Sequence, residues 1–176
     1  MNISPTGKLK NESQHIDLMV DRYKKSWTSF SEDVKREVIK ELDFLLRYSM
    51  KRSDQYPEDL RFALVSAKLA NGLFGISKIK QPEMLDLAKK YGTRAISNSP
   101  SGELGYKVMI EIFLSEGNFD QAMKFAEMLV DINPKVPEFH NLVIYIAKVQ
   151  KNGPLVDEKI KNARKFIPDY EYGLVK

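Results

Sequence analysis

The histidines and paired acids are the side chains of this sequence best suited to acid–base chemistry. His15 and His140 lie far apart in the sequence, and neither has a metal-ligating motif around it. Adjacent acids such as Glu32 and Asp33 point in different directions on a helix, so their charge is better explained as stabilising a helix start. There is no cysteine, no glycine-rich phosphate loop and no nucleophile elbow. We therefore predict a protein that is not an enzyme and uses no cofactor or metal.

Composition places the chain among folded proteins without a membrane span. Of its 176 residues 43% are hydrophobic and 30% are charged, which is ordinary for a globular domain or a compact helical array. No apolar run approaches the roughly 20 residues that cross a bilayer, and the polar N-terminus lacks a secretory signal. The net charge of +4 is too small to indicate nucleic acid by itself. We expect a cytoplasmic protein, or a periplasmic one if the chain is a piece of an exported or membrane protein.

Apolar residues recur at spacings of three and four along most of the chain, which predicts helices and no strands. The expected helices cover residues 15–27, 31–50, 57–75, 82–99, 103–116, 119–131, 137–150 and 155–166. The third helix is expected to weaken at Gly72 and Gly75, and residues 51–55 to form a loop. The predicted organisation is a flexible segment (1–13), an N-terminal helical pair (14–56), helical repeats (57–168) and a C-terminal tail (169–176).

Prolines mark an internal period of 34 residues. Pro100, Pro134 and Pro168 are each separated by that interval, and each follows a predicted helix. Ala88 and Ala122 are separated by the same interval. This is the period of tetratricopeptide repeats, in which one helical pair buries its apolar face only against a neighbouring pair.

Residues 105–134 resemble one tetratricopeptide repeat. The residues that carry the resemblance are Tyr106, Met109, Phe113, Gly117, Phe119, Ala122 and Pro134. Ile110 departs from the pattern, since a glycine or alanine usually lets the two helices approach there, and Phe125 stands one place before the usual aromatic position. In the following repeat Lys151 stands at the turn position. The resemblance implies an all-α fold of antiparallel helix pairs stacked as a short right-handed superhelix.

The resemblance also implies where a partner would bind. In such repeats the first helix of each pair lines a concave groove that takes an extended peptide or a partner helix. The corresponding residues are Leu104, Lys107, Glu111 and Leu114, with Ser115, on one helix, and Glu138, Asn141, Tyr145 and Lys148, with Val149, on the other. The function that we predict is therefore a protein-binding scaffold or adaptor.

The resemblance has consequences for two further groups of residues. Some family members hold a partner's C-terminal carboxylate with lysines and asparagines, but here Glu111 and Leu142 occupy two of those asparagine positions. A carboxylate next to Glu111 would be repelled, so we expect no such clamp. His140 occupies a bulky packing position, which predicts a packing role.

Two other functions remain open at this stage. The first is a helical accessory domain of a larger enzyme, because the repeat is loosely similar to helical tails of membrane-bound glycan-transferring enzymes. The second is binding of RNA or of an acidic partner by the lysine-rich C-terminal helix, although nucleic acid is the less favoured partner and a solvated end helix explains the same charges. Tyr170 and Tyr172 in the tail are expected to fold back over the last helical pair.

Overall fold

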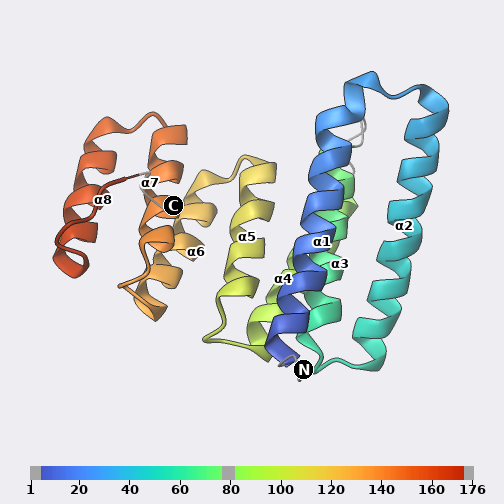
Figure 1. The fold of residues 1–176 in the computed structure, drawn as a ribbon, viewed down its shortest axis with the longest axis horizontal. Coiled ribbons are helices and arrows are strands. Elements are labelled where there is room, and N and C mark those ends of the chain that lie inside the picture. The colour runs from blue at the N-terminus through green and yellow to red at the C-terminus, as the bar shows by residue number, and fades with distance from the viewer. Residues whose placement is uncertain (1–4, 77–81, 173–176) are drawn as a thin grey trace. The chain divides into compact units, whose positions relative to one another are not determined.

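In the computed structural model the described residues, 5–76 and 82–172, contain helices and no strand (Figure 1). Side chains are described from His15 onward, except that of Asp17. The elements are α1 (Pro5–Ser26), a short 3₁₀ turn η1 (Trp27–Ser29), α2 (Glu32–Gln55), α3 (Leu60–Ile76), α4 (Pro82–Asn98), α5 (Glu103–Glu116), α6 (Phe119–Ile132), α7 (Pro137–Val149) and α8 (Gly153–Phe166). The all-α prediction is confirmed: successive helices pack against each other from α2 to α4 and from α5 to α8, as stacked helix pairs.

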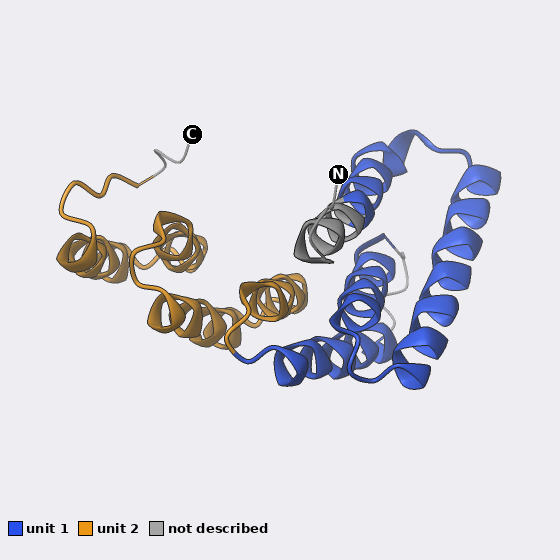
Figure 2. Cartoon of the chain, turned by 60° about the horizontal axis from the view of Figure 1, so that its bottom comes forward, with its two compact units in different colours: residues 1–100 blue, residues 101–176 orange. Residues whose placement is uncertain are grey.

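The chain forms two compact units, residues 1–100 and residues 101–176 (Figure 2). The first contains α1 to α4 and the second contains α5 to α8. The boundary expected from the sequence, between residues 56 and 57, falls inside the first unit. There α2 and α3 pack directly against each other.

Helix α3 is the centre of the first unit and packs against α1, α2 and α4. Its residues Leu64 and Leu69 are almost completely buried. The helix continues through Gly72 instead of weakening there, because α1 approaches it closely: a Cβ added to Gly72 would lie 2.9 Å from Cγ1 of Val20. The predicted N-terminal pair is therefore wrong in its partners, since α1 packs mainly on α3 and not on α2.

Three helix boundaries in this unit also differ from the prediction. Helix α1 begins at Pro5, so residues 5–13 are helical rather than a flexible lead-in, while residues 1–4 lie outside the described part of the chain. Residues 51–55 form the last turn of α2 and not a loop. Helix α3 begins at Leu60 rather than at Pro57, and Asp59 accepts a hydrogen bond from the N–H of Arg61 at its start.

Tertiary contacts explain why α2 continues through residues 51–55. The guanidinium of Arg52 lies 4.6 Å from the ring centre of Tyr56 and 5.3 Å from that of Phe62. Ser53 is fully buried, and its side-chain oxygen accepts a hydrogen bond from Arg94 of α4 at 3.0 Å. Phe62 belongs to α3 and Arg94 to α4, so local sequence pattern cannot reveal these two contacts.

The second unit repeats one turn geometry at a spacing of 34 residues. Gly117, between α5 and α6, has φ +80°, and Lys151, between α7 and α8, has φ +55°. The next residue in each turn caps the following helix: Asn118 accepts from the N–H of Gln121 at 3.2 Å, and Asn152 accepts from the N–H of Leu155 at 3.1 Å.

The residues that predicted a repeat form the interface between α5 and α6. Phe125 packs its ring 5.4 Å from that of Phe113 and 6.3 Å from that of Tyr106. Ala122 and Ala126 are fully buried. Phe125 therefore supplies the aromatic contact one position early, and the usual aromatic position is filled by a small side chain.

Candidate functional site

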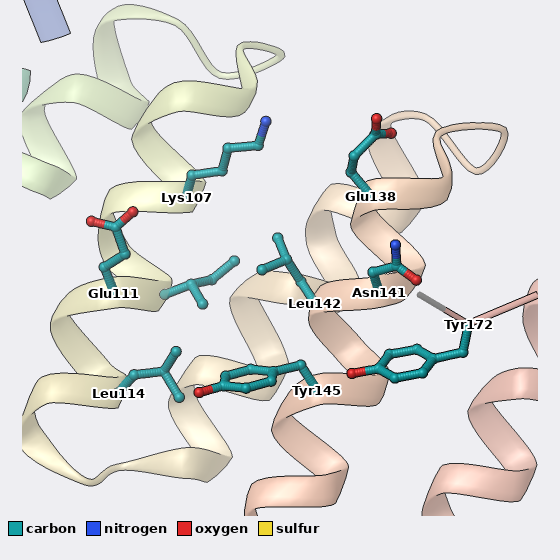
Figure 3. A pocket seen from close by; sticks show the side chains of 9 residues that line it. Lys107, Glu111, Leu114, Glu138, Asn141, Leu142, Tyr145 and Tyr172 are labelled. Atoms are coloured by element: carbon teal, nitrogen blue, oxygen red, sulfur yellow. The ribbon is translucent and has the colours of Figure 1, made fainter. Parts of the chain in front are cut away.

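An apolar groove lies between α5 and α7, the first helices of the two pairs in the second unit. It has a cavity volume of about 490 Å³. The lining residues are Lys107, Ile110, Glu111 and Leu114 of α5, Glu138, Asn141, Leu142 and Tyr145 of α7, and Tyr172 of the tail. Figure 3 shows the side chains of Leu114 and Tyr145 extending toward each other across the groove.

Six of the eight predicted binding residues line this groove: Lys107, Glu111, Leu114, Glu138, Asn141 and Tyr145. Leu104 and Lys148 are not among the lining residues. Sequence reasoning missed Ile110, Leu142 and Tyr172 as lining residues. The first two follow the three- and four-residue spacing of the predicted set, so periodicity could have found them. Tyr172 lies beyond α8, where no helical period applies.

Charged groups surround one end of the groove. The ammonium of Lys107 lies 2.9 Å from a carboxylate oxygen of Glu103, one turn earlier on α5, and 5.3 Å from the ring centre of Phe139. Figure 3 shows the side chains of Lys107 and Glu138 extending from α5 and α7 at this end. Lys107 thus contacts a carboxylate and an aromatic ring of its own chain.

The tail borders the groove through Tyr172. Tyr170 is 3% exposed, packs against Ile144 and Ala163, and donates a hydrogen bond from its hydroxyl to Oδ1 of Asn141. Burial, with a smaller contribution from the neighbouring Tyr172, raises the pKa of Tyr170 to about 12. The tail does fold back over the last helical pair, as the sequence predicted.

Of the two histidines considered for catalysis, His140 serves packing. His140 is 4% exposed, donates from Nε2 to the carbonyl oxygen of Pro134 at 2.8 Å, and stacks on Phe166 with ring centres 6.1 Å apart. The predicted packing role of His140 is confirmed. His15 is exposed on α1. Within the described residues there is no group of three or more potential metal ligands.

The lysine-rich C-terminal helix is partly neutralised. The ammonium of Lys159 lies 2.9 Å from a carboxylate oxygen of Glu127 on α6 and 3.3 Å from one of Glu158. These partners raise the pKa of Lys159 even though burial opposes the charge. Lys165 donates to Oδ1 of Asn162 at 2.8 Å. No helix in the described part of the chain is both long and apolar enough to cross a membrane.

Comparison with known proteins supports the fold and leaves the function open. No family model matches the sequence, and no curated protein matches it either. Among solved structures, one named "MamA MSR-1 C2" matches with a TM-score of 0.53 at 12% sequence identity, over 91% of this chain and 95% of that chain. That protein is a tetratricopeptide-like helical repeat, so the similarity shows a fold of the same kind here.

Proposed function

We propose that this chain is a non-catalytic protein-interaction scaffold, in which the groove between α5 and α7 binds an extended peptide or a helix of a partner protein. The observation that carries the proposal is the groove itself: an apolar cavity between the first helices of two successive repeats, with aromatic and aliphatic side chains from both helices. Grooves of this kind bind peptides through a few buried apolar anchors. The tetratricopeptide-like fold supports the same function.

Tyr145 is the side chain best placed to contact a partner. It is 49% exposed although it is a large aromatic residue, and its ring extends across the groove toward Leu114 (Figure 3). Tyrosine is one of the residues most enriched among the hot spots that dominate the binding energy of protein interfaces. Because Tyr145 is half exposed, its truncation should affect binding far more than folding.

Affinity capture with a matched control tests the proposal. The double variant Tyr145→Ala/Lys107→Glu should lose a captured protein, with unchanged helicity and melting temperature. Tyr48→Ala is the control, because Tyr48 is an aromatic residue of similar exposure (55%) on α2 of the other unit. Truncation of a hot-spot residue costs about 2 kcal/mol or more, or roughly thirtyfold in affinity. Equal capture by the double variant and the control would rule out the groove as the binding surface.

A further inference from the structure

The tail beyond α8 packs on apolar side chains of α7 and α8. In a repeat array each pair leaves an apolar face for its neighbour, and the last pair needs a cap. Here Tyr170 covers Ile144 of α7 and Ala163 of α8. Ile167 and Tyr172 pack against the same cluster. The tail thus covers an apolar face of α7 and α8.

Hydrogen bonds fix the course of the tail across this face. The N–H of Tyr170 donates to the carbonyl oxygen of Ile167 at 3.0 Å, which closes a turn after α8. The hydroxyl of Tyr170 donates to Asn141, a residue of α7 that also lines the groove. The segment that leads to Tyr172 in the groove is therefore anchored to α7 through Tyr170.

Tyr172 is itself held in place. The ammonium of Lys148 lies 3.7 Å from its ring centre, which is a close cation–π contact. The ring is half-buried, and its hydroxyl end is directed toward α7 (Figure 3). Lys148, a predicted binding residue, thus contacts a residue that lines the groove.

We infer that Tyr172 is a binding residue: the tail forms a third wall of the groove, and the site takes an aromatic side chain of a protein partner in the groove that Tyr145 and Tyr172 both line. This inference rests on the proposed function and names the chemistry of its partner. The cavity is bounded by two tyrosine rings and by the aliphatic side chains of Ile110, Leu114 and Leu142. Such walls favour a flat apolar group, because tilted or offset aromatic pairs gain about 0.5–1.5 kcal/mol beyond their burial.

Indole, the aromatic group of tryptophan, is the probe for this site. Its binding to the full chain is followed by the methyl resonances of Leu114 and Leu142 during an NMR titration. We expect Tyr172→Ala to raise the dissociation constant of indole about two- to tenfold, the factor that corresponds to one aromatic pair. Tyr172→Phe keeps the ring and should bind as the native chain does. Lys148→Ala, which releases the ring, should weaken binding in the same direction.

Each other outcome overturns the inference. Unchanged affinity in Tyr172→Ala would show that the tail is not part of the site. Tighter binding would show that Tyr172 competes with the ligand rather than forming a wall. No saturable response of the Leu114 and Leu142 methyls in the native chain would show that the aromatic site is not there. Tyr48→Ala is the control and should match the native chain.

The two proposals fail in different ways. If indole binding does not depend on Tyr172 while protein capture still depends on Tyr145, the tail inference is wrong and the scaffold proposal stands. If indole binding depends on Tyr172 but no protein is captured through Tyr145, the aromatic site exists without the proposed function.

Discussion

At the scale of single residues, the tyrosines of the second unit differ sharply in environment. Tyr145 is half exposed in the groove, whereas Tyr170 is buried and hydrogen-bonded to Asn141. The sequence shows both simply as aromatic residues near the C-terminus. The resemblance to tetratricopeptide repeats placed Tyr145 on the groove face, but nothing local distinguishes the buried tail tyrosine from an exposed one. The tail's position is decided by the apolar face of α7 and α8 that it covers.

The raised pKa of Tyr170 predicts a loss of stability at high pH. Its value of about 12 in the folded chain compares with roughly 10 for an unperturbed tyrosine. Below pH 10 the phenol is protonated in both states. Between about pH 10 and 12 the unfolded chain releases the proton while the folded chain retains it, so the free energy of unfolding falls as pH rises. Denaturant titrations of the native chain and Tyr170→Phe should therefore converge with rising pH across this window.

The control for this effect is Tyr48→Phe, which removes an exposed phenol. If the difference in stability between the native chain and Tyr170→Phe changes with pH no more than the difference between the native chain and this control, the raised pKa of Tyr170 is wrong.

At the scale of helices, helix-breaking residues and apolar spacing predicted the helix boundaries of the second unit closely. Helix α5 spans the predicted residues 103–116, and α6 ends one residue beyond its predicted end. Gly117 and Pro134 fix these limits by local chemistry, which a sequence displays directly. Prediction was poorer for α1 and for the end of α2. Residues 5–14 show no apolar period, and residues 51–55 are held helical by contacts with other helices.

The two repeat turns allow a reciprocal test of backbone conformation. Positions 117 and 151 both have positive φ, but one is glycine and the other is lysine. A left-handed conformation costs a residue with a Cβ about 1–2 kcal/mol, partly offset by the greater freedom of glycine in the unfolded chain. Gly117→Lys should therefore destabilise the fold by about 1 kcal/mol, and Lys151→Gly should stabilise it by a similar or smaller amount.

Steric clashes do not affect this comparison, because a Cβ at Gly117 would meet nothing within 4 Å and Lys151 is exposed. Chemical denaturation of the two single variants and of the double swap measures both effects. If both substitutions change stability in the same direction, backbone conformation is not what distinguishes the two turns.

At the scale of the whole molecule, the two compact units predict separable unfolding. The single tryptophan of the chain, Trp27, lies in the first unit and reports on it by fluorescence, while circular dichroism reports on helices of both. Phe113 of the second unit is 8% exposed and Leu64 of the first is 1% exposed. Their truncation to alanine should cost about 3–5 and 2–5 kcal/mol respectively.

Phe113→Ala should therefore leave the Trp27 transition in place and lower only part of the dichroism transition. Leu64→Ala should move the Trp27 transition to lower denaturant concentration. A Trp27 transition that shifts equally in both variants would mean that the chain unfolds as one cooperative body. In that case mutations in α1 to α4 would also change occupancy of the groove through global stability. Binding assays on groove variants are therefore best interpreted after these two transitions have been measured.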